Sequence, residues 1–263
     1  NYTAGGSLPT GLSTGTTYYV FNLDGTTFQL LNSAGAVVNT SGSASVNAYI
    51  SLLVDVPTVQ NIVTVSDANR FVIAMGCNDY GSSQQDPMLI RWSHQEDPYN
   101  WTPDATNQAG SVRLSHGSKI VTSVQTRQEI FVLTDSSAYS LQYLGPPYVW
   151  QSQLLGDNIS IVSPNAAVIA SGIVYWMGRD KFYMYNGNVS TLNCDLRRYV
   201  FQDFNTLQSQ QVYAGTNEQF NEVWWFYCSA NSNVIDRYVI FNYLENTWYY
   251  GTMGRTAWLD SGM

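Results

Sequence analysis

Apolar and polar residues alternate at every second position along much of this sequence. In one stretch Tyr139, Leu141 and Tyr143 fall on one side of the alternation, and Ser140 and Gln142 fall on the other. Because successive side chains of an extended chain point to opposite faces, this pattern predicts a β-strand. A second kind of stretch is apolar at every position, as in VWWFY at 223–227. Such a run is typical of a strand that is covered on both faces.

The predicted strands recur as antiparallel pairs separated by turn residues. We expect pairs at 70–75 with 88–92, 129–134 with 138–143, 173–177 with 181–185, and 222–228 with 237–242, and a further strand at 247–250. These units begin near residues 71, 130, 173 and 223. A spacing of roughly 40–60 residues is expected for propeller blades, whereas a β-sandwich would show a tighter and more even spacing. We therefore predict an all-β chain in which residues 58–263 form an irregular, incomplete β-propeller of antiparallel blades.

The N-terminal residues differ in composition from the rest of the chain. Residues 1–48 are rich in Gly, Thr and Ser and contain none of the eight tryptophans. Two β-rich runs, 17–21 and 26–30, flank the turn Asn22-Leu23-Asp24-Gly25, and residues 33–36 turn into Val37-Val38. Asp-Gly between such runs is a strong hairpin signal. We predict a small β-hairpin module at 1–48, inserted in or appended to the main body.

One short helix is expected. Asp195 is a suitable N-cap, and Leu196, Val200, Phe204 and Leu207 follow at helical spacing. This helix should connect two blades.

Composition and charge narrow the possible functions. The net charge is −8, charged residues make up 11% of the chain, and the lysines are Lys119 and Lys181 alone. Nucleic-acid-binding surfaces show a basic stripe, which this sequence lacks. An acidic surface would instead let DNA pass without specific binding. Aromatic residues at 14% and apolar residues at 44% argue against disorder.

No metal, cofactor or membrane signal emerges. Cys77, Cys194 and Cys228 form no C-x-x-C pair, so we expect buried free thiols and no metal ligands. Gly215-Thr216-Asn217 lacks the lysine that follows in a phosphate-binding loop. The longest apolar run, 166–177, is shorter than the ~20 residues that cross a bilayer.

Residues 90–103, IRWSHQEDPYNWTP, are the most chemically suggestive stretch. They hold Trp92, His94, Glu96, Asp97 and Trp101, which could stack a sugar ring and protonate a leaving group. The same residues could form the end of a β-hairpin that is pinned by its two tryptophans. Residues 240–248, IFNYLENTW, repeat the order of strand, polar turn and tryptophan. Because a catalytic cluster would not be expected twice, we favour the structural interpretation.

A hydrolytic triad has little support. The chain has two histidines, and Ser93 directly precedes His94 as Ser115 precedes His116. Neighbours on an extended strand point to opposite faces, so neither pair should form a local Ser–His hydrogen bond.

A glycosidase needs two carboxylates held ~5–10 Å apart across a cleft. Several acidic residues are candidates, but most of them fall in turn dipeptides or hairpin turns. The candidates are Asp86, Glu96, Asp97, Asp104, Asp157, Asp180 and Asp203. We therefore expect no enzyme activity and assign no catalytic, cofactor-binding or metal-binding residue.

Tryptophan and tyrosine offer one more possible function. The chain has eight tryptophans and 19 tyrosines, which could form a platform for sugar rings. Most of the tryptophans lie inside strand patterns, so packing between blades explains them better. The tryptophans are Trp92, Trp101, Trp150, Trp176, Trp224, Trp225, Trp248 and Trp258.

Several segments together resemble a family of structural proteins from tailed bacteriophages, the β-propeller nozzle, tail tubular and tail-stabilisation proteins. The N-terminal residues 7–38 resemble a small β insertion common in phage structural proteins. The segments of the body are RFVIAMGCNDYGSSQQDPMLIRWSHQEDPYNWTP, TRQEIFVLTDSSAYSLQYLGPPYVW, VYWMGRDKFYMYNGN and EVWWFYCSANSNVIDRYVIFNYLENTWYYGTMGRTAWLDSG.

The resemblance implies a virion protein of the phage tail, present as a homo-oligomeric ring, typically a hexamer, around the channel through which DNA leaves. Its partners would be its own copies and other tail proteins, with no cofactor and no membrane. The chain is shorter than a complete nozzle subunit, which predicts that it is part of a longer polypeptide. Two alternatives remain, a carbohydrate-binding or host-recognition tail module and a tail-associated glycosidase.

Overall fold

The chain divides into two compact units, Asn1–Leu52 and Leu53–Met263. The computed structural model describes residues 9–13, 16, 18–21, 28–41, 55–255 and 257–259. Within the described residues, no helix is both long and apolar enough to cross a membrane.

The first unit contains a three-stranded antiparallel sheet in the order β1-β2-β3. Its strands are β1 (Tyr19–Phe21), β2 (Gln29–Leu31) and β3 (Val37–Val38). The pairing of β1 with β2 confirms the predicted hairpin strands, while the turn at 22–25 lies outside the described residues. The Asn32 side chain accepts hydrogen bonds from the backbone N–H groups of Ala34 and Ala36, both at 3.0 Å, and so stabilises the turn into β3.

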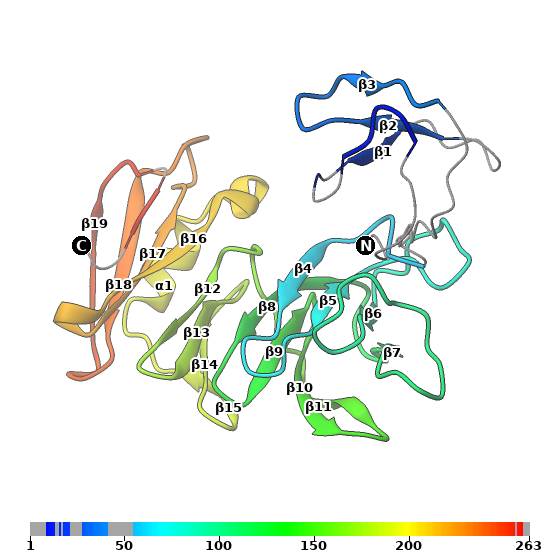
Figure 1. Cartoon of the computed structure of the whole chain (residues 1–263). Helices are drawn as coiled ribbons and strands as arrows, with labels where there is room; N and C mark the ends of the chain where they lie inside the picture. Colours follow the sequence, from blue (N-terminus) through cyan, green and yellow to red (C-terminus); the bar gives the residue numbers. More distant parts are fainter. Residues whose placement is uncertain are drawn as a thin grey trace. The chain divides into compact units, whose positions relative to one another are not determined.

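The second unit contains four four-stranded antiparallel sheets, each a meander of consecutive strands (Figure 1). Blade 1 consists of β4 (Ile62–Val65), β5 (Val72–Met75), β6 (Leu89–Trp92) and β7 (Gly110–Arg113). Blade 2 consists of β8 (Ile120–Gln125), β9 (Glu129–Thr134), β10 (Ser137–Gly145) and β11 (Val149–Asp157). Blade 3 consists of β12 (Ala167–Ala170), β13 (Ile173–Met177), β14 (Phe182–Tyr185) and β15 (Val189–Leu192). Blade 4 consists of β16 (Tyr213–Asn217), β17 (Glu222–Tyr227), β18 (Arg237–Asn242) and β19 (Thr247–Thr252).

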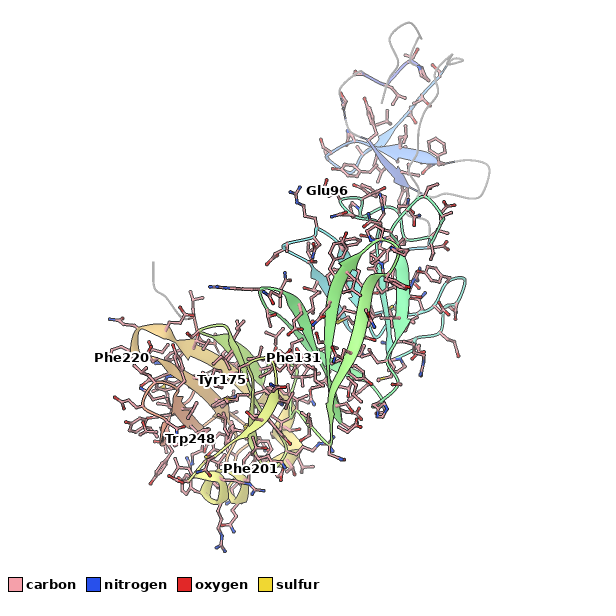
Figure 2. The ribbon with its side chains drawn as sticks, turned by 90° about the horizontal axis from the view of Figure 1, so that it is seen from below. Glu96, Phe131, Tyr175, Phe201, Phe220 and Trp248 are labelled. Atoms are coloured by element: carbon pink, nitrogen blue, oxygen red, sulfur yellow. The ribbon has the colours of Figure 1, made fainter. Side chains whose placement is uncertain are left out.

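The blades pack face to face. On β9, Ile130 and Val132 belong to the core shared with blade 1, and Phe131 and Leu133 belong to the core shared with blades 3 and 4. Figure 2 shows Phe131 between the strands of blade 2 and those of blade 3. A strand that is apolar at every position thus serves two cores, as the unbroken apolar runs predicted.

The first strands of blades 2, 3 and 4 lie side by side, because β8 contacts β12 and β12 contacts β16. No core cluster of the described residues joins blade 1 to blade 4. The protein is therefore an all-β chain whose body is an irregular β-propeller of four antiparallel blades, and the paired strands predicted from the sequence are the central strands of these blades.

The helix between blades 3 and 4 is shorter than predicted. α1 covers Arg197–Gln202, its N-cap is Leu196, and no side chain caps it, so the prediction of Asp195 as N-cap was wrong. Phe204 instead forms a β-bridge with Ser229, which ends the helical spacing. Leu207 lies in the 3₁₀ helix η1 (Thr206–Gln211) with 90% of its surface exposed. A second 3₁₀ helix, η2, covers Glu218–Phe220.

Candidate assembly surface

The stretch at 90–103 forms a tightly bonded blade corner. Trp92 and Trp101 are 4% and 3% exposed. The indole N–H of Trp92 donates to the backbone oxygen of Gln108 at 2.8 Å, and that of Trp101 donates to Pro98 at 2.8 Å. A Cβ at Gly110 would lie 2.7 Å from the Trp92 ring, so glycine is required there. Both tryptophans are buried, as the structural interpretation predicted.

The acid pair in this stretch lies in the turn. Glu96 has a left-handed backbone, φ 59°, and its carboxylate forms an ion pair with Arg70 at 2.9 Å. Asp97 accepts a hydrogen bond from the backbone N–H of Tyr99 at 3.0 Å. Within the second unit, Figure 2 shows Glu96 well apart from the labelled core residues Phe131 and Trp248. The two carboxylates are thus committed to surface and turn contacts.

His94 has a structural contact that the sequence did not reveal. Its Nδ1 accepts a hydrogen bond from the backbone N–H of Gln108 at 3.0 Å, which ties the corner to the approach to β7. The Ser93 hydroxyl donates to the backbone oxygen of His94 at 2.9 Å and does not bond the ring. Ser93 is 1% exposed and makes no hydrogen bond to the His94 ring. The pair therefore has a structural role in the corner and is not arranged as a nucleophile with its base.

The second histidine pairs with a carboxylate. His116 Nδ1 lies 3.0 Å from Asp157 Oδ1, and the Ser137 hydroxyl donates to the same oxygen at 2.9 Å. In a catalytic triad the serine would donate to the histidine, which in turn is oriented by the acid. Here serine and histidine both contact the acid. Ser115 lies 3.5 Å from the Tyr139 hydroxyl instead.

The remaining candidate carboxylates also have local partners. Asp180 pairs with Arg197 at 3.0 Å, and Asp203 pairs with Arg237 at 3.2 Å. Asp104 accepts hydrogen bonds from the backbone N–H and the hydroxyl of Thr106, both at 2.8 Å. These partners are those of turns and surface ion pairs.

Asp86 is likewise held in place. Burial raises the pKa of its carboxyl, but the hydrogen bonds from Arg113 and from the backbone of Met88 outweigh burial, so the pKa falls below its usual value. Three cavities of the described residues are lined by Asp135 or Glu129 and by none of the candidate carboxylates. In the described part of the chain no cluster of His, Cys, Asp or Glu is placed to hold a metal ion.

The cysteines are free. Cys77 and Cys228 are buried, and Cys194 is half-buried. Burial raises the pKa of Cys77 to about 11 and that of Cys194 to about 12. The thiolate is therefore disfavoured at all three positions, since burial raises the pKa of Cys228 as well.

The burial of the tryptophans distinguishes a role in packing between blades from a role in sugar binding. Trp176 and Trp225 are fully buried, and Trp248 packs against Phe182 and Phe241 with ring centroids 4.8 and 4.7 Å apart. None of the eight tryptophans is among the exposed large side chains of the described residues. Packing between blades accounts for most of them.

One aromatic surface is not covered by another blade. We call it the blade-4 outer face; it is formed by the half-buried Tyr213, Trp224, Tyr238 and Trp258, with the fully buried Phe226 beneath them. Strand register places these strand residues on the side of blade 4 opposite Val223 and Trp225, which face blade 3. Figure 2 shows Phe220, 58% exposed, at the edge of the same blade.

The segment after β19 covers part of this face. The Trp258 ring stacks on Trp224 with centroids 5.0 Å apart, and its indole N–H donates to the backbone oxygen of Thr216 at 2.7 Å. The Tyr213 hydroxyl donates to the backbone oxygen of Trp258 at 2.8 Å. A Cβ at Gly215 would lie 2.5 Å from the Trp258 ring. Half-buried aromatic side chains of this kind are enriched at protein interfaces.

A polar cluster between blades 2 and 3 was missed in the sequence. The hydroxyls of Ser140 and Tyr185 donate to the Glu129 carboxylate, and the Gln142 side chain donates to it at 2.9 Å. Burial raises the pKa of Glu129, but these three hydrogen bonds outweigh it and lower the pKa below its usual value. The sequence predicted that Ser140 and Gln142 share a face, but it did not reveal that both donate to the half-buried Glu129 on the neighbouring strand.

Sequence and structure comparisons add little to this picture. No known family model and no curated protein sequence matches the chain. Hsv2 from Kluyvelomyces marxianus is a similar solved structure, with a TM-score of 0.41 and 9% identity over 84% of this chain and 56% of that chain. The WD40 domain of SCAP from fission yeast has a TM-score of 0.36 and 9% identity, over 88% of this chain and 60% of that domain. The chain spans less than two thirds of both proteins, and at these scores the fold assignment rests on the strand topology of the chain itself.

Proposed function

We propose that this chain is a non-enzymatic structural component of a bacteriophage tail, a nozzle-like or tail-tube-like protein that assembles into a ring with its own copies. The observation that carries the proposal is the blade-4 outer face, an aromatic surface of Tyr213, Trp224, Tyr238 and Trp258 at the end of an open series of blades. An end blade with such a face is suited to contact another protein.

Two further observations support this proposal. The net charge of −8 suits the wall of a conduit through which DNA passes without specific binding, because like charges repel. The four segments that carry the resemblance to tail proteins contain the central strands of blades 1 to 4, so the resemblance concerns the blade cores.

The rival functions have weaker support. A sugar platform needs exposed aromatic rings, but the described tryptophans are buried or half-buried. A glycosidase needs two carboxylates facing one cleft, but Glu96, Asp97 and the other candidates are held by turns and ion pairs. The half-buried Trp224 and Trp258 still make a carbohydrate-binding surface the second candidate.

A complementation experiment tests the proposal. Phage particles are produced without this chain, and the wild-type chain or the Glu96→Ala/Asp97→Ala variant is then supplied during infection. We expect DNA-filled heads with incomplete tails in its absence, and equal recovery of infectivity with both versions. Complete particles that lose only polysaccharide cleavage or host adsorption would contradict the proposal and favour one of the rivals.

A further inference from the structure

A cavity of about 630 Å³ lies where the starts of β4 and β8 meet the segments that precede β12 and β16. Residues from the start of each of the first three blades and from the segment before blade 4 line it. Ile62, Val121, Ile161 and Phe204 form apolar parts of its wall. A cavity of this size is in the range that holds a small molecule or a few residues of a peptide.

A strand edge borders the cavity. β8 is the last strand in the order of its sheet, so one row of its backbone N–H and C=O groups has no partner strand within the blade. Ile120, Val121 and Thr122 of this strand line the cavity, and the backbone N–H of the buried Ile120 already donates to the backbone oxygen of Pro87 at 2.9 Å, so the open part of the edge lies beyond Ile120. An extended peptide can add to such an edge through backbone hydrogen bonds, while its side chains enter neighbouring pockets.

The charges at the cavity favour an acidic ligand. Lys119 and Arg179 both line it, both are exposed, and neither forms an ion pair within the described residues. Asp135 also lines the cavity, but its carboxylate accepts hydrogen bonds from the backbone N–H of Ser118 at 2.8 Å and from the Ser118 hydroxyl. Two unpaired cations therefore face one carboxylate that is already bonded.

The cations of the described chain differ in whether they form ion pairs. Four other arginines of the described chain form ion pairs, namely Arg70, Arg113, Arg197 and Arg237. Arg91, Arg127, Lys181, Arg198 and Arg255 also form no ion pair within the described residues, so what marks this cavity is that two such cations line one wall. It offers charge-assisted hydrogen bonds to a carboxylate.

We propose that this cavity binds an extended peptide segment with acidic side chains, contributed by a partner protein. The free edge of β8 would pair with the peptide backbone, and Lys119 and Arg179 would pair with its carboxylates. A nucleic acid fits less well, because phosphate binding needs a basic stripe, whereas two cations and one carboxylate line this cavity. The inference does not depend on a role in a phage tail.

Selection from a random hexapeptide display library tests this inference with the full chain. The wild type is compared with the Lys119→Gln/Arg179→Gln variant and with Arg198→Gln, which removes an exposed arginine on α1 that does not line the cavity. Melting temperatures first establish that each variant is folded, and the single variant Arg179→Gln replaces the double variant if that one fails to fold. Fluorescence anisotropy then measures the selected peptides.

We expect the selected peptides to contain Asp or Glu, and to bind the wild type and Arg198→Gln equally. The double variant, which removes both cations, should bind about tenfold more weakly or worse, as should amide versions of the peptides, because both changes remove the charge-assisted hydrogen bonds. The inference is overturned if no peptide is selected, if acidic residues are not enriched, or if the double variant binds equally. It is also overturned if a fluorescent oligothymidylate binds through Lys119 and Arg179 while the peptides do not.

Discussion

Trp92 and Glu96 lie four positions apart in the same corner, yet their surroundings differ completely. Trp92 is 4% exposed and packs where Gly110 leaves room, while the Glu96 and Arg70 side chains are 58% and 71% exposed. The sequence allowed us to predict the burial of Trp92, because tryptophan within a strand pattern favours packing. The sequence did not predict the contact of His94. The His94 ring accepts a hydrogen bond from the backbone N–H of Gln108, which lies in a segment with no distinctive pattern.

This contrast gives a prediction at the scale of residues. Trp92→Ala should lower the free energy of unfolding by about 3–5 kcal/mol, because it deletes a buried large aromatic side chain. Glu96→Ala should change it by less than about 1 kcal/mol, since exposed ion pairs contribute little. Urea unfolding of the two variants and the wild type measures both values. Equal unfolding midpoints for Trp92→Ala and the wild type would contradict the buried corner.

At the scale of elements, the period of apolar residues predicted the central strands of all four blades, because each such strand must bury side chains. The outer and inner strands were harder to predict. β4 leaves Val63 and Val65 more than half exposed, and β7 alternates between half-buried and exposed positions, so their patterns are weak. The end of α1 was predicted wrongly because Phe204 has an apolar side chain that satisfies the helical spacing but forms a bridge to Ser229.

The Glu129 cluster, which links blades 2 and 3, gives a prediction about pH. Because the pKa of Glu129 in the folded protein lies below its usual value of 4.5, its ionised form stabilises the fold above about pH 4.5, and that contribution is lost as the pH falls further. Glu129→Gln should therefore cost about 1–3 kcal/mol at pH 7, as expected for lost hydrogen bonds to a charged group.

The difference between the wild type and Glu129→Gln should shrink as the pH is lowered below about 4.5, where the wild-type carboxyl becomes protonated. Urea midpoints of both proteins at neutral and acidic pH measure this difference. The other carboxylates with lowered pKa, Asp86, Asp104 and Asp135, are common to both proteins and cancel in the comparison. A difference that is constant with pH would show that the charge of Glu129 does not stabilise the fold.

At the scale of the whole molecule, four blades share two main cores, and the series ends in the blade-4 outer face. The irregular propeller could be predicted from the sequence because every blade repeats the same apolar pattern. The cavity could not, since Lys119 and Arg179 lie in separate blades and only the fold brings them to one wall. The proposed assembly depends on surface residues. The fold constrains the identity of surface residues much less than that of core residues, so the sequence gives a weaker signal for them.

We propose that this chain is a ring component of a phage tail. The most direct test is electron microscopy of purified phage particles decorated with an antibody fragment that binds the exposed part of the chain near Tyr148, in the turn between β10 and β11. We predict antibody density around the tail axis at one level along the tail. Undecorated particles from infections in which the chain is produced, or density confined to fibres that project from the tail, would contradict it.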